Sequence, residues 1–220
     1  DMLTRDIALN RAVIDLIDNS IDGARRLKPD PNEDLTGLEI VIDLNGQGFR
    51  IKDNCGGISV DLARKYAFRI GRPKGMPNTP NSVGQFGVGM KRALFKFGHK
   101  FTVKSATATE RFSINVDVDS WEADETNWKF RFDNIEQGLS IAESDIGTEI
   151  EVPQLRKSVA AAFELEANQN LIAREIQAAQ QQYIDRGLRI AFNGKTLLAT
   201  SWMLLRGEGI EPAKDEWTIS

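Results

Sequence analysis

The chain has 220 residues, enough for one large domain or for a domain with a small appendage. Hydrophobic residues make up 41% of it and charged residues 27%, as in an ordinary globular protein. The net charge of −4 argues against a nucleic-acid-binding surface spread over the whole chain, although it does not exclude local basic patches. A single cysteine excludes an internal disulfide framework, a single histidine excludes multi-histidine metal sites, and no apolar run approaches the roughly 18 residues of a membrane span.

The first predicted element is a helix from about Leu3 to Leu27, because its apolar residues gather on one side at helical spacing. The stretch "KPDPNED" ends this helix, since two prolines cannot continue it. "LEIVIDLNGQGFRIKD" then predicts two strands joined by a turn that contains Asn-Gly. A second helix is expected from about Val60 to Ile70.

Residues Gly71 to Gly84 hold three prolines and three glycines and predict a long loop, of the kind that often forms a lid or a binding loop. A short helix is expected from about Met90 to Phe97. Four strands follow in the prediction, over "KFTVKSAT", "RFSINVDVD", "WKFRFDN" and "GTEIEV". A long helix over 158–186 and a hairpin around Asn193-Gly194 complete the chain. This order predicts an α+β fold, a two-layer α/β sandwich with helices on one face of a mixed, mainly antiparallel sheet.

Three segments carry candidate chemistry, and the first lies on the N-terminal helix. Asp15, Asn19 and Asp22 fall within about 60° of one another, opposite the apolar stripe. Such a stripe is usually a solvated face. If it lines a pocket instead, the Asn oxygen can hold a hard cation and the acid can orient water.

The second segment is "DNCGGIS", in which Asp53 ends a predicted strand and Gly56 and Gly57 follow. Glycine allows positive φ and lets a flat ligand approach the backbone, and a carboxylate there can accept a hydrogen bond from an exocyclic amine such as that of adenine. A plain strand-ending turn explains the same residues.

The third segment is "GQFGVGMKRALFKFG", with Gly84, Gly87 and Gly89 before a helix and Lys91 within it. Free N–H groups at a helix start can bind phosphates, and a lysine adds charge. The glycine order differs from the Rossmann fingerprint, and the G-K-[ST] of a Walker A loop is missing. A glycine-rich turn without a ligand is the alternative.

Taken together and in order, the segments resemble the GHKL ATPases (gyrase, heat-shock chaperone, histidine kinase, MutL), whose nucleotide-binding unit is the Bergerat fold. "DLIDNSIDGA", "DNCGGI", "GQFGVGMK" and "GTEIEV" are similar to the four boxes of the family, over about residues 3–152. The first and third boxes also resemble those of MORC proteins, and "GQFGVG" that of the 90-kDa heat-shock chaperone. The resemblance implies an ATP-binding domain over 1–155 with an ATP lid at about 71–84. Residues 156–220 would extend this domain or start another.

The resemblance also implies roles for individual residues and the cofactors ATP and Mg2+. Asp15 would be the catalytic, water-activating acid, Asn19 the Mg2+ ligand and Asp53 the partner of the adenine amine, with Thr148 completing that contact. Within the lid, Arg72 or Lys74 would fold over the phosphates. The nucleotide-contacting set is Asn19, Asp22, Asp53, Gly57, Ile58, Gly84, Gln85, Phe86, Gly87, Val88, Gly89, Met90, Lys91 and Thr148.

Two positions depart from the family pattern. The family's acid is usually Glu, whereas residue 15 is Asp, and a displacement of about 1 Å can cost about 10²-fold in rate. We therefore expect slow hydrolysis unless the backbone lies closer. In the second box Cys55 replaces the first glycine, which predicts a shifted turn.

Other candidates favour structural roles. We expect Cys55 to be a small buried filler, His99 to cap helix carbonyls, and Lys91, Arg92, Lys96 and Lys100 to form a solvated helix face with DNA contact as the alternative. The four tryptophans, Trp121, Trp128, Trp202 and Trp217, are expected to pack or to meet downstream domains.

The expected function is that of a switch in which ATP or ADP binding controls dimerisation or domain closure of a larger protein, with nucleic acid as a partner of the wider protein. We expect a cytoplasmic location, or a nuclear one in a eukaryote, with no membrane contact. Two alternatives stay open. One is a histidine-kinase catalytic module, which needs no acid four residues before the Asn. The other is a nucleotide-free interaction module on a decayed ATPase fold.

Overall fold

The computed structural model describes residues 7–68, 88–123 and 130–199. The elements in chain order are α1 (Leu9–Leu27), β1 (Glu39–Asn45), β2 (Gly48–Asp53), α2 (Val60–Leu62), the π-helical turn η1 (Ala63–Ala67), α3 (Val88–Phe97), β3 (Gly98–Ala106), β4 (Glu110–Asp117), α4 (Val118–Ala123), β5 (Asn134–Gln137), the 3-10 turn η2 (Glu143–Asp145), β6 (Gly147–Leu155), α5 (Lys157–Glu164), α6 (Glu166–Ile184), β7 (Arg189–Phe192) and β8 (Lys195–Thr196). Among these helices, none combines the length and apolar character needed to cross a membrane.

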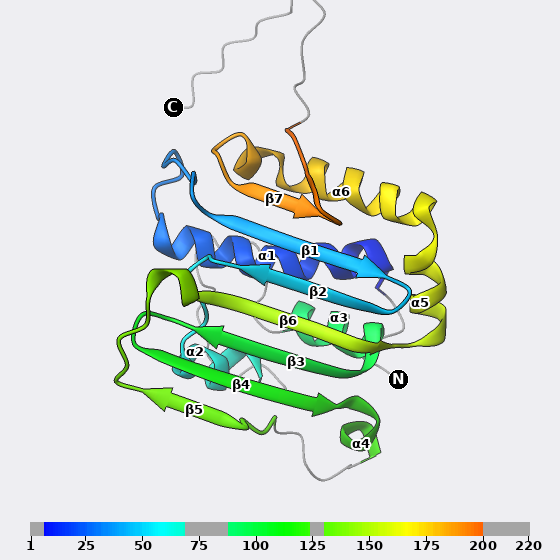
Figure 1. Ribbon diagram of the computed structural model, residues 1–220, viewed down its shortest axis with the longest axis horizontal. Coiled ribbons are helices and arrows are strands. Elements are labelled where there is room, and N and C mark those ends of the chain that lie inside the picture. Colours follow the sequence, from blue (N-terminus) through cyan, green and yellow to red (C-terminus); the bar gives the residue numbers. More distant parts are fainter. Residues whose placement is uncertain (1–6, 69–87, 124–129, 200–220) are drawn as a thin grey trace, which may run out of the picture.

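The strands of the described residues form one sheet in the order β5-β4-β3-β6-β2-β1-β7-β8 (Figure 1). Every pair is antiparallel except β1–β7, where Ile40 lies beside Ile190. The α+β class and the mixed, mainly antiparallel sheet are therefore confirmed. β7 joins this sheet although it lies far along the chain, in the segment beyond residue 155.

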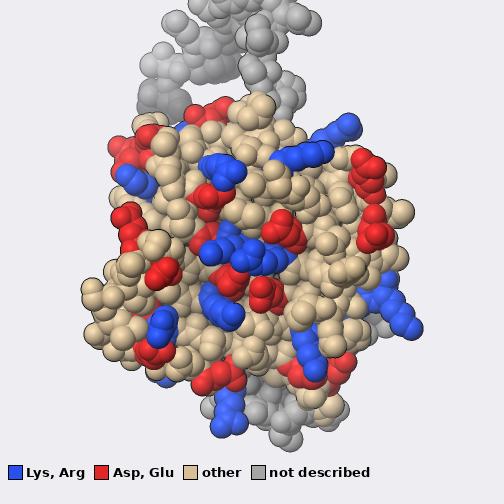
Figure 2. Space-filling view, viewed as in Figure 1, with Lys and Arg blue, Asp and Glu red and all other residues tan. Residues whose placement is uncertain are grey.

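Helices α1, α2 and α3 lie behind the sheet in Figure 1, and the face toward the viewer carries no helix. Strand side chains alternate accordingly: Ile40, Ile42 and Leu44 of β1 are buried under the helices. On the uncovered face Lys and Arg are intermixed with Asp and Glu (Figure 2). There Arg50 makes ion pairs with Glu149 and with Glu151, the latter at 3.5 Å.

Both predicted hairpins are confirmed. β1 and β2 pair around Gly46-Gln47, and β7 and β8 pair around Asn193-Gly194. Asn193 and Gly194 have φ of 47° and 76°, as a type I′ turn requires. The N-terminal helix begins at Leu9 in the described residues, and Leu3 lies outside them.

Two predicted elements differ from the structure because side-chain contacts override the local pattern. The single helix over 158–186 is wrong: Leu165 is extended (ψ 116°) and separates α5 from α6. The side-chain amides of Asn168 and Gln169 donate to the carbonyl oxygens of Ala162 and Phe163 at 2.9 and 2.7 Å. These bonds give hydrogen-bond partners to carbonyl groups in the last turn of α5 and stabilise the break between the two helices.

The strand over "WKFRFDN" is also wrong in the part that the structure describes, since β5 begins only at Asn134. Phe130 stacks on Trp121 at 5.5 Å, and Phe132 lies 5.3 Å from Phe112. The alternating phenylalanines therefore anchor an irregular segment on an aromatic cluster. After β4, Asp117 accepts the Ser120 N–H at 3.0 Å and starts α4, which the sequence did not predict.

The helix predicted from Val60 to Ile70 changes character along its length. α2 spans only Val60–Leu62 and continues as η1, whose end is marked by the Phe68 N–H bonding the Ala63 carbonyl at 2.9 Å. Ile70 and the predicted loop 71–84 lie outside the described residues.

A substitution at Phe163 tests whether α5 is part of the hydrophobic core formed by the rest of the domain. Its ring is fully buried and packs 5.4 Å from that of Phe97. We expect Phe163→Ala to lower the free energy of unfolding by about 3–5 kcal/mol, measured by denaturant titration, because it leaves a cavity in the shared core. Leu165→Ala, at a side chain 58% exposed, is the control and should change it by less than about 0.5 kcal/mol. A small loss at Phe163 would show that α5 is not part of the core.

Candidate functional site

The site is built around Asp53, the last residue of β2. Its carboxylate is buried and held from three elements: the Ser20 hydroxyl of α1 donates to Oδ2 at 2.6 Å, and the N–H groups of Cys55 and of Thr148, the latter from β6, donate to Oδ1 at 2.9 and 3.3 Å. Burial raises the pKa of Asp53, while these hydrogen bonds oppose the rise. Oδ2 accepts only the Ser20 bond among those found, and so keeps capacity for another donor.

Glycines let the backbones around Asp53 approach closely. A Cβ at Gly23 of α1 would lie 2.4 Å from the Cys55 carbonyl oxygen, and one at Gly147 would lie 1.9 Å from that of Asp53. A Cβ at Gly57 (φ +68°) would lie 2.0 Å from the Ala106 carbonyl oxygen. Gly57 is thus needed for contact with β3, besides facing the cavity.

Cys55 stands where the family has a glycine, yet it is not in the left-handed region that favours glycine. The turn therefore accepts a side chain there without strain. Cys55 is buried, and burial raises the pKa of its thiol, which keeps it protonated. The predicted role as a small buried filler is confirmed.

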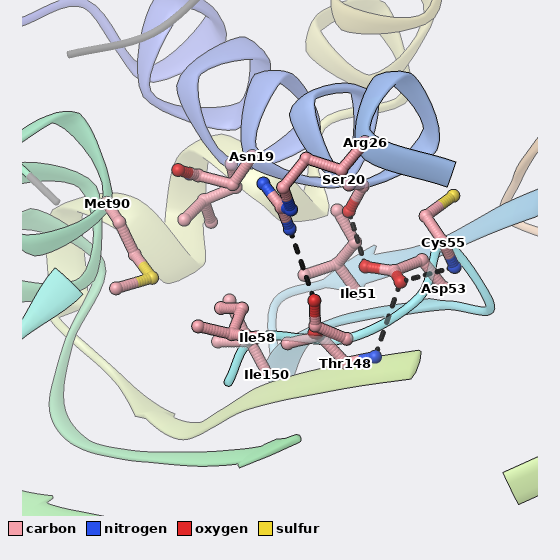
Figure 3. A pocket seen from close by; sticks show the side chains of 13 residues that line it. Asn19, Ser20, Arg26, Ile51, Asp53, Cys55, Ile58, Met90, Thr148 and Ile150 are labelled. Atoms are coloured by element: carbon pink, nitrogen blue, oxygen red, sulfur yellow. Dashed lines mark hydrogen bonds between the residues drawn. The ribbon is translucent and has the colours of Figure 1, made fainter. Parts of the chain in front are cut away.

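A small cavity opens beside Asp53, between α1 and the sheet (Figure 3). Its volume is about 10 Å³, roughly one water. Its lining mixes apolar walls with a few polar groups, as in ligand sites: Leu16, Asn19, Ser20, Gly23, Arg26, Ile51, Asp53, Cys55, Gly57, Ile58, Met90, Thr148 and Ile150. Of the predicted set, Asn19, Asp53, Gly57, Ile58, Met90 and Thr148 are thus brought together.

The polar stripe of α1 is only partly a solvated face. Asn19 lines the cavity, and its amide nitrogen donates to the Asp15 carbonyl oxygen at 2.7 Å, which leaves the side-chain oxygen for a cation. Asp15 lies one turn earlier, where Arg11 Nε contacts its Oδ1 at 2.9 Å. Asp22 is buried beside Arg25 but does not line the cavity.

The start of α3 lies against the acid. A Cβ at Gly89 would lie 3.1 Å from Asp15 Oδ2, so only glycine lets the helices pack this closely without a shift. Within the described residues α3 begins at Val88, two residues before the predicted start, and the start of a helix is a position where N–H groups can bind an anion. Lys91 is buried in this helix, and burial lowers its pKa to about 8. Gly84, Gln85, Phe86 and Gly87 lie outside the described residues.

Seven lining residues are outside the predicted set, and Ser20, Gly23 and Arg26 are the three of them considered next. Ser20 lies on the buried side of α1, where a polar residue needs a buried partner, and this requirement was the available signal. Gly23 lies within α1, where glycine is unfavourable, and this was a signal of a close approach. Arg26, whose Nη2 donates to the Gly57 carbonyl oxygen at 3.1 Å, left no such signal.

Two further expectations need correction. His99 lies in β3, where its Nδ1 is 2.9 Å from both carboxylate oxygens of Asp119, and not at the helix end as a cap for carbonyls. The prediction that Lys91, Arg92, Lys96 and Lys100 form a solvated helix face is wrong because Lys91 is buried.

The ring of Trp121 packs against that of Phe95 with their centroids 4.9 Å apart, as expected, while Trp128, Trp202 and Trp217 lie outside the described residues.

Comparison with known proteins decides the family. The family model described as histidine kinase-, DNA gyrase B- and HSP90-like ATPase matches residues 7–148, which include α1, Asp53 and Thr148. The chain belongs to this ATPase family. The predicted GHKL resemblance is therefore confirmed.

A solved relative shares the fold of this GHKL ATPase chain. The crystal structure of the ATPase and transducer domains of DNA topoisomerase II from Balamuthia mandrillaris matches with a TM-score of 0.57 at 14% identity, covering 87% of this chain and 48% of that one. The chain thus spans about half the length of that structure. The search of curated proteins found no match to this chain.

The substitution Asp53→Asn is expected to change both the ATP affinity of this GHKL chain and the pH dependence of its stability. The amide oxygen can still accept the Cys55 and Thr148 N–H groups, but the NH2 group would face an adenine amine, so we expect ATP affinity measured by calorimetry to fall at least about 100-fold. Because folding raises the pKa of Asp53, the folded wild type binds this proton more tightly than the unfolded chain does. Wild-type stability therefore falls relative to the variant as pH rises above about 4, the ordinary pKa of an Asp side chain.

Thermal melts across that range check the second part of this prediction. A stability difference between the wild type and the variant that does not change with pH would contradict the linkage. Unchanged ATP affinity would contradict the assignment of Asp53.

Proposed function

We propose that the cleft binds Mg-ATP, with the adenine beside Asp53, and hydrolyses it slowly. The observation that carries this proposal is the buried Asp53 carboxylate, held by Ser20, Cys55 and Thr148 with acceptor capacity directed at a cavity. A carboxylate so fixed can accept the exocyclic amine of adenine and disfavours the carbonyl that guanine carries at the same place. Family membership supports ATP as the nucleotide.

The residues beyond the base pocket suit a metal-bound triphosphate. The Asn19 oxygen would hold Mg2+, since its amide nitrogen is already used by the Asp15 carbonyl. When bound, Mg2+ neutralises charge that develops on the phosphates. The N–H groups in the first turn of α3 are placed to bind phosphate oxygens, and Lys91 of the same helix adds positive charge. Gly84 to Gly87 belong to this proposal from the sequence alone.

Asp15 is the residue that we propose to orient and deprotonate the attacking water. Its Oδ1 is held by Arg11 while Oδ2 faces Gly89 at the start of α3. The close packing of α1 and α3 at Gly89 supports the idea that a nearer backbone compensates for a side chain one methylene shorter than Glu. The contact with Arg11 holds the carboxylate in one orientation beside α3.

The wider role extends this proposal. Nucleotide binding would order the lid at about 71–84 and promote dimerisation or closure against other domains of a longer protein. The lid lies outside the described residues, so its support is the loop composition and the family resemblance. Nucleic acid would be met by the wider protein.

Asp15→Asn tests the proposed chemistry. We expect the steady-state rate of phosphate release to fall by about 10²–10⁴-fold, because a general base is lost, while the calorimetric Kd for ATP stays within about twofold. Asp43→Asn, at a half-exposed position on the uncovered face of the sheet, makes the same chemical change away from the cleft and should leave both quantities unchanged. A wild type that releases phosphate no faster than Asp15→Asn would contradict hydrolysis by this acid.

A further inference from the structure

Arg26 occupies the mouth of the cavity in which the proposed function places the base. It lies in the last turn of α1, and its guanidinium crosses to the opposite wall, where Nη2 donates to the Gly57 carbonyl oxygen at 3.1 Å. Figure 3 shows the guanidinium between α1 and the sheet, beside the Asp53 carboxylate. A side chain of α1 is thus bonded across the pocket to the turn that follows β2.

The cavity that remains is too small for a purine. Its volume of about 10 Å³ holds one water, whereas a purine has nine ring atoms besides its exocyclic group. A base can therefore enter only if part of the lining moves.

Several of the other walls are held by close packing. Ile51 and Ile150 belong to neighbouring strands of the sheet, and Leu16 is buried within α1. At Gly57 and Gly147 the backbone is packed against backbone. Arg26 instead is an exposed residue at a helix end, with room to swing outward into solvent.

We propose that Arg26 is a latch on the base pocket, which closes on Gly57 when nucleotide is absent and must swing out as the base enters. The inference rests on the proposed function and adds its regulation. The guanidinium resembles the adenine edge, since both are planar and present N–H donors near Asp53. Because only the open fraction binds, the latch weakens the apparent affinity by that fraction.

The test is calorimetry with the wild type, Arg26→Ala and Arg25→Ala, each titrated with Mg-ATP and with adenosine. We expect Arg26→Ala to bind both ligands roughly tenfold more tightly, near the lower value of a charge-assisted hydrogen bond. The factor should be equal for both ligands, because Arg26 competes with the base and not with the triphosphate. Arg25→Ala removes the same charge from the same helical turn, away from the cavity, and should give no gain.

The outcomes separate the latch from the proposed function. If the wild type binds ATP but Arg26→Ala binds no more tightly, or more weakly, the latch is wrong and the function stands. A gain with ATP and none with adenosine also overturns the latch, since the arginine would then act on phosphate. If neither protein binds either ligand, both proposals fail.

Arg26→Met keeps the test decisive if Arg26→Ala does not fold. It retains a long stem at the end of α1 but has no donor for the Gly57 carbonyl, so it should also bind both ligands more tightly. Thermal melts followed by circular dichroism identify which variants are folded. A folded Arg26→Met with wild-type affinity for both ligands would overturn the latch.

Discussion

One buried carboxylate joins the fold to the site. Asp53 ends β2 below α1, and burying its charge is costly unless hydrogen bonds satisfy it. Ser20 supplies one from the helix, while Cys55 and Thr148 supply two from the adjoining turn and from β6. The same bonds place α1 over the sheet and leave the carboxylate facing the cavity. One side chain therefore serves both the placement of α1 and the cavity.

Close backbone packing makes the rest of the pocket rigid. Gly23 and Gly147 stand where any Cβ would collide with a carbonyl oxygen of the segment 53–55. Among the side chains that line the cavity, Arg26 makes the contact across it, to the Gly57 carbonyl oxygen. On the phosphate side Gly89 brings α3 against Asp15, so small residues set the spacing at both ends of the cleft.

The sequence alone predicted those features that depend on residues close together in the chain. Asn193-Gly194 adopts positive φ in its hairpin, and the four boxes predicted Asp53, Asn19 and Thr148, which the fold brings to one cavity. What failed depends on distant partners. The break at Leu165 relies on side-chain amides that reach back to α5, and the Phe130 segment follows an aromatic cluster and not a strand ladder. Arg26 contacts Gly57 only because the fold brings α1 over that turn.

The most direct measurement of the central claim is a crystal structure of this chain with Mg2+ and a non-hydrolysable ATP analogue. The account predicts the adenine amine within about 3.2 Å of an Asp53 carboxylate oxygen, the Asn19 oxygen on the cation and the phosphates at the start of α3. A nucleotide bound elsewhere, for example on the uncovered face of the sheet near Lys52 and Lys104, with the cavity beside Asp53 still closed, would contradict it.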